Sequence, residues 1–314
     1  MPTAYHIPAM LSETIEGLAI KPDGIYVDVT FGGGGHSRAI LQEMDKGQKG
    51  RGHLYSFDQD KDALSNAIDD ERWTFVHSNF RYLCNWMDYY DIKQIDGLLA
   101  DLGVSFHHFD CPERGFSFRF SAPLDMRMNQ TAKRTAADIV NSYSEEQLAN
   151  IFWLYGELKN GRAIAKAICK ARAQRPMERT EDLVSVITKD EKLEVNGEIE
   201  IAPQYKKDLA KLFQALRIEV NDEMGALREM LVAARDLLKP GGRIAILTYH
   251  SLEDRLVKNF LRSGNLEGTI EKDFYGNILT PFTIIEKGRA AGAAEVEINP
   301  RSRSAKLRVA ERKA

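Results

Sequence analysis

The sequence contains little cysteine and no long hydrophobic run. Its three cysteines, Cys84, Cys111 and Cys169, are scattered and form no Cys-x-x-Cys pair. This argues against a disulfide framework or a zinc site and fits a reducing cytoplasm. No apolar run approaches the roughly 20 residues that a membrane span requires. The first ten residues lack a charged segment followed by an apolar one, so we expect a cytoplasmic protein without a secretory signal or membrane partner.

An excess of charge of one sign is also absent. The 314 residues include 43 Lys and Arg against 46 Asp and Glu, which gives a formal net charge of −3. Any nucleic-acid surface must therefore be local, because the chain has no overall basic character. The hydrophobic fraction of 43% and the charged fraction of 28% are those of an ordinary globular protein. The length exceeds what one compact unit usually needs.

Segments typical of strands and helices alternate at both ends of the chain. The expected strands cover residues 25–31, 53–58, 73–78, 95–103, 243–251 and 305–312. The expected helices between them cover residues 35–44, 61–68, 221–238 and 253–261. Nearly continuous apolar strands separated by helices are typical of a parallel sheet that is covered on both faces.

The alternation stops in the middle of the chain. Residues 106–134 are irregular and rich in aromatic residues and arginine, and residues 135–216 predict only helices, one of which starts with a capping box from Ser144 to Gln147. We therefore expect an α/β fold with a mainly parallel, Rossmann-like sheet. Its domain would be discontinuous, formed by residues 1–105 and 217–314, and interrupted by an all-helical insertion at 106–216.

A glycine run points to a ligand site. The first strand runs into Gly32–Gly35, and a helix follows. Such a turn lets a ligand approach the backbone, and the helix N-terminus offers unpaired N–H groups. Asp58 ends the second strand, where an acid can accept hydrogen bonds from ribose hydroxyls. The pair predicts a nucleotide or nucleoside site; the alternative is a tight turn beside a solvated aspartate.

The details of the glycine run narrow the choice of ligand. No lysine follows it as in a P-loop, which disfavours ATP and GTP, and Ser37 stands at the third glycine place of the dinucleotide fingerprint. The stretch from Asp28 to Gly34 reads Asp-x-Thr-x-Gly-x-Gly, which is similar to the first motif of S-adenosylmethionine-dependent methyltransferases. Gly32–His36, Asp58 and Asp101 all fall at strand ends, where open α/β sheets bind ligands.

Longer motifs carry a closer resemblance. GGGGHSRAIL, VHSNF, DLGVS, PERGFSFRFSAPLDMRM, FQALRIEVNDE and NPRSRSAKLRVAER together resemble the bacterial 16S ribosomal RNA (cytosine-N4)-methyltransferases of the MraW type. The resemblance extends from His6 to Arg312. It implies an S-adenosylmethionine-binding domain with a helical insertion that binds the RNA substrate. It also implies methylation of the exocyclic N4 amino group of a cytidine in the decoding region, with 16S rRNA or the 30S subunit as partner.

The resemblance also assigns site residues. The family's cofactor contacts fall on Gly34, Gly35, His36, Asp58, Phe80 and Asp101. One further contact, a glutamine in the family, falls on His108, which cannot copy both faces of an amide. Asp101 would accept a hydrogen bond from the cytosine amino group as the proton is lost, and cofactor binding is an equally good role for it. Phe106, Phe116 and Phe118 are candidates for stacking on the target base.

One predicted helix, residues 159–179, is a candidate RNA surface. Lys159, Arg162, Lys166 and Lys170 recur at spacings of three and four on one face, and the opposite face, expected to pack inward, carries Ala163, Ile164, Ala167, Ile168 and Ala171. Residues 301–313 add six basic residues. Both stretches are plausible phosphate contacts; the alternative is a solvated helix face and a disordered tail. Residues 116–121 are alternatively a short strand with one buried face.

Other interpretations remain open at this point. The stretch HSLED at 250–254 is assigned to a capping box between Ser251 and Asp254, and no metal site is predicted. A methyltransferase of the same fold could act on another nucleic-acid amino group. A dinucleotide-dependent oxidoreductase is disfavoured by Ser37, and a non-catalytic RNA-binding module is disfavoured by the intact glycines, Asp58 and Asp101. The oligomeric state is not readable from the sequence.

Overall fold

The computed structural model describes residues 8–46, 50–104, 111–189, 192–195 and 198–314. The chain divides into two compact units. The first, here called the sheet unit, comprises Met1–Gly103 and Met224–Ala314, and the second, here called the insertion, comprises Val104–Glu223. The last helix of the insertion continues to Asn221 and ends where Asp222 adopts a left-handed conformation with a φ of 46°.

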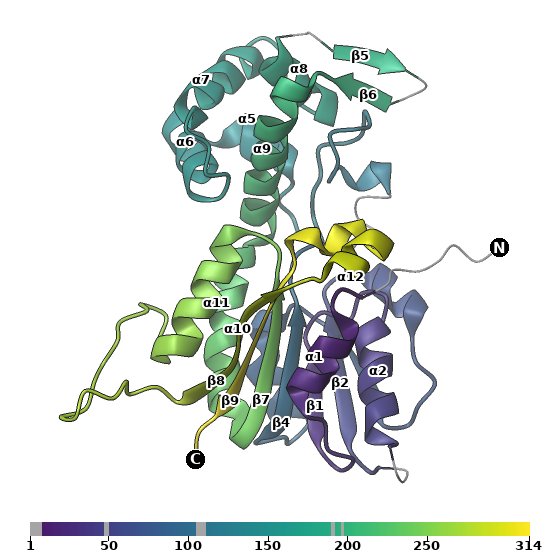
Figure 1. Cartoon of the computed structure of the whole chain (residues 1–314). Helices are drawn as coiled ribbons and strands as arrows, with labels where there is room; N and C mark the ends of the chain where they lie inside the picture. Colours follow the sequence, from purple (N-terminus) through teal and green to yellow (C-terminus); the bar gives the residue numbers. More distant parts are fainter. Residues whose placement is uncertain (1–7, 47–49, 105–110, 190–191, 196–197) are drawn as a thin grey trace. The chain divides into compact units, whose positions relative to one another are not determined.

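A seven-stranded sheet forms the centre of the sheet unit, in the order β3-β2-β1-β4-β7-β9-β8 (Figure 1). The strands are β1 (Ile25–Asp28), β2 (His53–Asp58), β3 (Trp73–His77), β4 (Ile95–Asp101), β7 (Leu238–Thr248), β8 (Phe282–Ala290) and β9 (Lys306–Arg312). Neighbours from β3 to β7 pair in parallel, and β9 pairs antiparallel with both β7 and β8. The mainly parallel, Rossmann-like sheet predicted from the sequence is confirmed.

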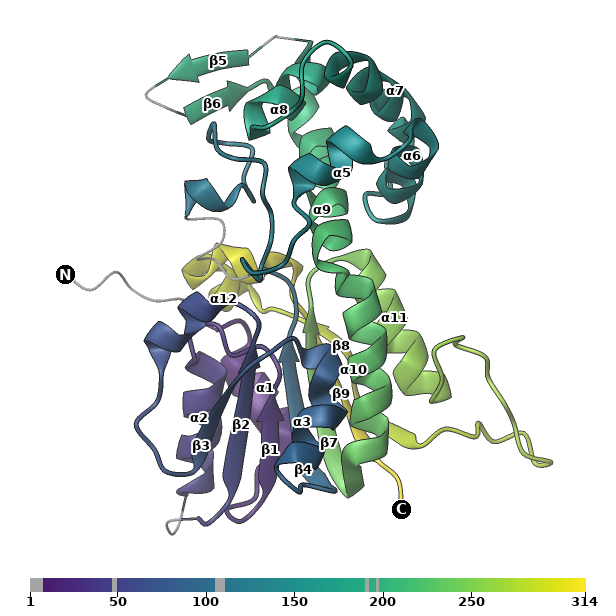
Figure 2. The ribbon, with the colours of Figure 1, turned by 180° about the vertical axis from the view of Figure 1, so that it is seen from behind.

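Helices cover both faces of this sheet. They are α1 (Leu11–Leu18), α2 (Gly35–Met44), α3 (Leu83–Tyr89), α10 (Glu223–Leu237) and α11 (Ser251–Ser263). A further short helix, α12 (Ala293–Ile298), has no buried residue. Figures 1 and 2 show α1 and α2 on one face and α3 and α10 on the other. Apolar side chains from α1, α2 and the central strands form one buried core, which includes Leu18, Ile40, Met44, Leu54, Leu99, Leu247 and Val309.

One local expectation for the sheet unit is wrong, and one strand was not predicted. The segment predicted as a helix at 61–68 is a 3₁₀ helix, η1 (Lys61–Asn66), which ends where Ala67 leaves the helical conformation. The strand that was not predicted is β8. Only Phe282 of this edge strand is buried, and two register shifts interrupt its pairing with β9. Such an edge strand needs no regular alternation of apolar and polar residues, and its sequence shows none.

The insertion is built mainly of helices around its own apolar core. These are α5 (Ala136–Ser142), α6 (Glu145–Leu154), α7 (Gly161–Arg172), α8 (Thr180–Thr188) and α9 (Pro203–Asn221), with the 3₁₀ turn η3 (Pro112–Arg114). The capping box at the start of α6 is confirmed, since Ser144 Oγ accepts from the Gln147 N–H and the Gln147 side chain accepts from the Ser144 N–H. Core residues come from every one of these helices.

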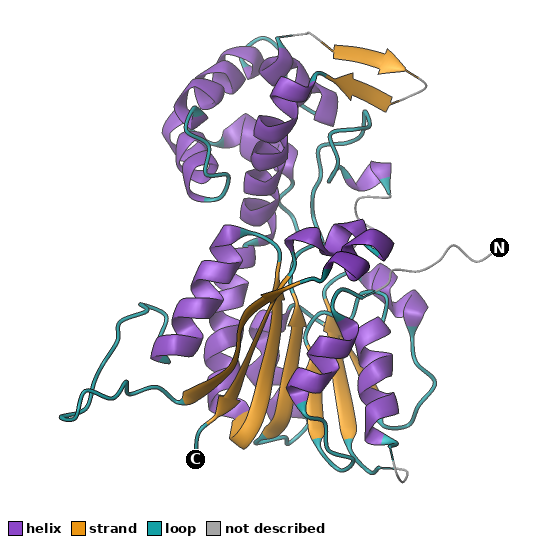
Figure 3. Ribbon diagram, in the orientation of Figure 1, coloured by secondary structure: helices purple, strands orange, loops and turns teal. Residues whose placement is uncertain are grey.

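The expectation of an all-helical insertion is wrong in one place. An antiparallel hairpin, β5 (Lys192–Val195) and β6 (Glu198–Ile201), stands among the helices (Figure 3). Its sequence, KLEVNGEIEI, alternates apolar and polar residues on both sides of Asn-Gly. Asn-Gly between alternating segments is a strong hairpin signal, although these two residues lie outside the described part of the chain.

The described ranges contain no candidate for a membrane-spanning helix. None of their helices is both long enough and apolar enough to cross a bilayer.

Candidate functional site

The carboxyl ends of the parallel strands bring most of the predicted site residues together. Strand order runs outward from β1 to β2 and β3 on one side, and from β4 to β7 on the other. The connections therefore reverse direction between β1 and β4, and such a switch point is where open α/β sheets bind ligands. The glycine loop follows β1, while Asp58 ends β2 and Asp101 ends β4.

The glycine loop is shaped by backbone geometry that favours glycine at two positions. Gly32 and Gly34 have φ angles of 50° and 74°, a left-handed region that costs other residues free energy. A Cβ atom on Gly34 would lie 2.9 Å from the Phe31 ring, whereas one on Gly32 would meet no atom closer than 4.0 Å. Gly34 is thus required by packing at the start of α2, and Gly32 borders open space at the strand ends.

A buried acid fastens this loop. Asp28, at the end of β1, accepts hydrogen bonds from the Thr30 N–H over 3.0 Å and from Ser37 Oγ over 2.6 Å. Burial raises the pKa of Asp28, and the hydrogen bond from Ser37 opposes that rise. Ser37 stands where the dinucleotide-binding fingerprint has its third glycine. Its hydrogen bond to Asp28 ties the first turn of α2 to β1.

Asp58 holds the loop from the neighbouring strand. Its Oδ2 accepts from the Gly32 N–H and its Oδ1 from the Asp60 N–H, each over 2.8 Å. Burial raises the pKa of Asp58 to about 6, while the two backbone hydrogen bonds lower it. Each carboxylate oxygen has a second lone pair, so Asp58 can accept from ribose hydroxyls while it still holds Gly32.

Phe80 lies just beyond the end of β3. It begins the 3₁₀ helix η2 (Phe80–Tyr82), which Asn79 caps by accepting from the Arg81 N–H over 3.0 Å. Asn79 also donates to Gln59 Oε1 over 2.8 Å, which links the segments after β2 and β3. Phe80 is half-buried, so its ring can pack on a ligand at this edge. His108 and Phe106 lie outside the described residues.

Asp101 is held at both its backbone and its side chain. Its N–H donates to Thr30 Oγ1 over 2.6 Å, and its Oδ1 accepts from the Tyr249 hydroxyl over 2.6 Å. Burial raises the pKa of Asp101 to about 7, and the hydrogen bond from Tyr249 opposes that rise. The side chain is nevertheless 16% exposed, so a substrate group can reach it.

His36 faces the same acid from α2. Its Nδ1 lies 3.7 Å from Asp101 Oδ2, which is too long for a hydrogen bond. Burial lowers the pKa of His36, so the imidazole is neutral near pH 7. Its Nε2 is buried without a hydrogen-bond partner among the described residues. A buried polar atom of this kind, with the open space beside Gly32 and the acids at two strand ends, fits a polar nucleoside such as S-adenosylmethionine.

Tyr249 also lies at this edge and was not predicted from the sequence. This residue directly follows β7, and its N–H donates to Glu253 Oε2 over 2.8 Å. The rule that placed Asp101 at a strand end also assigns the end of β7 to this edge, but it does not single out Tyr249. The capping box assigned to Ser251 and Asp254 is wrong by one position, because His250 is the N-cap of α11 and pairs with Glu253.

The aromatic candidates in the insertion have structural roles. Phe116 is buried in the core of the insertion, and Phe118 packs edge-on against Phe213 with ring centroids 5.5 Å apart. These contacts hold both rings in the core of the insertion. The alternative of a short strand over residues 116–121 is wrong, because only Phe120 makes a single bridge, to Glu198.

The basic helix is shorter than expected but keeps its exposed face. Arg162, Lys166 and Lys170 on α7 are exposed, and Ile164 and Ile168 are buried as predicted. Lys159 precedes the helix. Three of the expected inward positions differ, since Ala163 is exposed and Ala167 and Ala171 are only half-buried, while Ala165 is fully buried. The apolar stripe is therefore rotated toward Ala165.

The C-terminal basic stretch is ordered. Residues 306–312 form β9, so the alternative of a disordered tail is wrong. Arg308 is buried and donates to Asp254 over 2.8 Å, which removes it from the candidate phosphate contacts.

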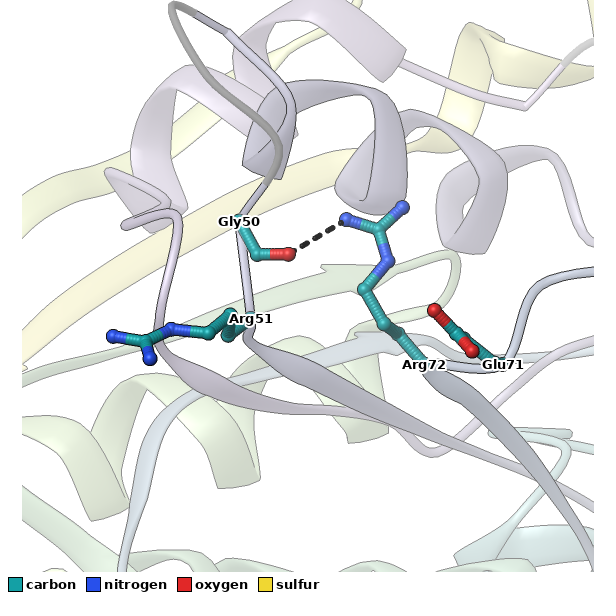
Figure 4. Close-up of a pocket in the computed structure, with 4 residues that line it drawn as sticks. All are labelled: Gly50, Arg51, Glu71 and Arg72. Carbon is teal, nitrogen blue, oxygen red and sulfur yellow. Dashed lines mark hydrogen bonds between the residues drawn. The ribbon is translucent and has the colours of Figure 1, made fainter.

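A separate hollow lies at the opposite end of the strands. It measures about 460 Å³ and is lined by Gly50, Arg51, Glu71 and Arg72, with Gly50 and Arg72 joined by a hydrogen bond (Figure 4). Arg72 forms ion pairs with Asp45 and Asp70 at 2.8 and 2.6 Å. These residues precede β2 and β3, so the hollow is not part of the site at the carboxyl ends.

Comparisons with known proteins identify the family. Residues 3–313 match the model of the MraW methylase family. The chain is 57% identical over 310 residues to a ribosomal RNA small subunit methyltransferase H of Phocaeicola vulgatus and 58% identical over 310 residues to that of Bacteroides thetaiotaomicron, with 98% of both chains covered in each case. Among solved structures, an rRNA methylase from Streptococcus thermophilus is 12% identical with a TM-score of 0.42, covering 99% of this chain and all of the other.

Proposed function

We infer that this chain, which belongs to the MraW methylase family, methylates the exocyclic N4 amino group of a cytidine in the decoding region of 16S ribosomal RNA. It is a methyltransferase, and S-adenosylmethionine is its cofactor. The relatives named ribosomal RNA small subunit methyltransferase H support the substrate class. The observation that carries the cofactor site is the meeting of the glycine loop, Asp58 and Asp101 at the switch point of the sheet, and the family match over residues 3–313 carries the substrate.

We propose that the cofactor is held by Gly34, Gly35, His36, Asp58, Phe80, Asp101 and His108. When bound, it supplies an electrophilic methyl group on a sulfonium. Asp58 would accept hydrogen bonds from the ribose, as its remaining lone pairs allow. Phe80 would pack on the adenine, and the open side of Gly32 would let the ligand lie close to the backbone.

Asp101 is the proposed proton acceptor of the reaction. The N4 amino group is a weak nucleophile because its lone pair is delocalised into the cytosine ring, so alignment with the methyl group matters. A hydrogen bond from the amino group to Asp101 would turn the lone pair toward the methyl carbon. The proton would pass to the carboxylate as the C–N bond forms. Because Oδ1 is engaged by Tyr249, Oδ2 is the oxygen assigned to this role.

Mass spectrometry of digested rRNA tests the proposed function. Purified protein, labelled S-adenosylmethionine and either 16S rRNA or assembled 30S subunits are expected to give N4-methylcytidine at one position of the decoding region. Comparison of the two substrates identifies which one the enzyme uses. Label in another amino group would favour the alternative substrate, and RNA binding without any transfer would contradict the enzyme function itself.

A basic face on α7 is proposed as the RNA contact of the insertion. Replacing Arg162 and Lys166 by glutamate should weaken binding to 16S rRNA and lower the slope of log affinity against log salt by about one per lost phosphate contact. Lys258 is also exposed but lies on α11, so Lys258→Glu is the matched control. Equal effects of the α7 pair and the control on the salt slope would contradict a specific contact.

Phe80 gives a second prediction. Phe80→Ala should lower the affinity for S-adenosylhomocysteine by roughly tenfold, since stacking of an aromatic ring on a base contributes about 1–3 kcal/mol. Calorimetric titration measures this loss. Tyr82 lies in the same 3₁₀ helix and is 51% exposed, so Tyr82→Ala should leave the affinity unchanged. An unchanged affinity in the Phe80 variant would exclude the adenine contact.

A further inference from the structure

We propose that the Tyr249 hydroxyl is a positioning group for Asp101, holding the carboxylate by Oδ1 so that Oδ2 is directed to the target amino group. The inference rests on the proposed function, because it assigns a role within that reaction. Tyr249 follows β7, the strand that pairs in parallel with β4. It therefore reaches Asp101 along the edge of the sheet and donates its hydrogen bond over 2.6 Å.

The contact is fixed from both sides. The Tyr249 N–H is anchored to Glu253 Oε2 over 2.8 Å, and its ring lies beside Gly103, where an added Cβ would come within 3.3 Å. The Asp101 N–H is anchored to Thr30 Oγ1 over 2.6 Å. These backbone hydrogen bonds fix the chain positions from which the hydroxyl and the carboxylate meet, and such support is what holds a reacting group in one geometry.

The hydroxyl also favours the charged form of the carboxylate. The titratable groups that face Asp101 or Tyr249 are Asp28 from β1, His36 from α2, Glu253 from α11 and Glu295 from α12. Glu253 opposes ionisation of Asp101, and His36 is neutral because burial lowers its pKa. The hydrogen bond from Tyr249 is the contact that favours the ionised form, since it lowers the pKa of Asp101 against the effect of burial.

The test is the pH profile of single-turnover methyl transfer by Tyr249→Phe. Phenylalanine keeps the ring and removes only the hydroxyl. The acidic limb of the profile should move to higher pH by about one unit, the shift expected from losing one hydrogen bond to a charged group. Transfer at pH 7 should then fall several-fold and recover toward the wild-type rate at alkaline pH, while the affinity for S-adenosylhomocysteine stays constant.

Tyr26 provides the matched control. It is also a buried tyrosine, but its hydroxyl accepts from the Lys21 N–H, in the segment that precedes β1. Tyr26→Phe should therefore leave the pH profile in place even if it alters thermal unfolding. A rate that falls equally at all pH values in Tyr249→Phe would indicate a merely structural role, and an unchanged profile would also overturn the proposal.

A measurement without substrate separates this inference from the proposed function. In protein labelled with ¹³C-aspartate, the Asp101 carboxyl signal is identified by its absence in Asp101→Asn and titrated by NMR. Its midpoint should rise in Tyr249→Phe and stay constant in Tyr26→Phe; a constant midpoint in Tyr249→Phe would overturn the inference. If the midpoint rises but the wild-type enzyme methylates no cytidine, the proposed function fails and the contact between Tyr249 and Asp101 stands.

Discussion

Asp101→Asn is expected to slow methyl transfer by at least about a hundredfold, the range typical of losing a positioned proton acceptor. Asparagine retains an oxygen that can accept from the Tyr249 hydroxyl, so the local packing should persist. What it loses is the negative charge and the ability to take up a proton. Single-turnover transfer measures the loss, and calorimetry with S-adenosylhomocysteine measures cofactor affinity separately.

The two readouts distinguish the two roles proposed for Asp101. A slow reaction with cofactor affinity within a few-fold of wild type indicates the proton acceptor. A comparable loss of cofactor affinity would show that Asp101 is mainly a cofactor ligand. Full turnover in the variant would contradict the acceptor role altogether.

The same substitution should stabilise the protein above neutral pH. Burial raises the pKa of Asp101 to about 7 in the folded state, whereas the unfolded chain ionises near pH 4. As the pH rises from about 4 to 7, the unfolded state loses its proton first, so the free energy of unfolding falls. Asp101→Asn removes this loss. Thermal unfolding at pH 8 should therefore occur a few degrees higher than in the wild type, with little difference at pH 4.

A buried active-site acid such as Asp101 is kept for function although it lowers stability. Local sequence rules describe stable structure, so they fail most often at functional sites. The glycine loop, Asp58 and Asp101 were predictable because strand periodicity places them at carboxyl ends, and parallel strands share one edge. Tyr249 was not predicted, because its importance depends on a partner 148 positions away. No local pattern encodes that contact. The switch-point rule gave the edge where it occurs, but not the side chain that meets Asp101.

Helix and strand boundaries show a related limit. The sequence of β5 and β6 contains a recognisable hairpin signal, Asn-Gly between two alternating segments. It was overlooked because the segments around it all predict helices. Strand β8 had none, because an edge strand with a single fully buried residue owes its conformation to pairing with β9 rather than to its own pattern. The basic helix was predicted with the correct exposed charges, while its buried stripe depended on tertiary packing around Ala165.

Asp58→Ala is expected to abolish measurable cofactor binding at concentrations that saturate the wild type. Hydrogen bonds to a charged group contribute about 1.5–3 kcal/mol each, so losing two ribose contacts should lower the affinity by more than about a hundredfold. The substitution also releases the Gly32 N–H, which Asp58 holds over 2.8 Å, so the glycine loop loses an anchor. Asp69 is exposed in the same connection between β2 and β3, and Asp69→Ala should bind S-adenosylhomocysteine as the wild type does.

The pH dependence of binding separates the direct contact from the loss of loop order. Burial raises the pKa of Asp58 to about 6 in the free protein. Below that pH the carboxyl is protonated and offers fewer acceptor sites, so the wild-type affinity for S-adenosylhomocysteine should fall as the pH drops through about 6. Asp58→Asn, which keeps one oxygen for the Gly32 N–H, should bind weakly at every pH without this transition. If Asp58→Asn kept wild-type affinity at pH 8, Asp58 would serve only to order the loop, and the ribose contact proposed here would be wrong.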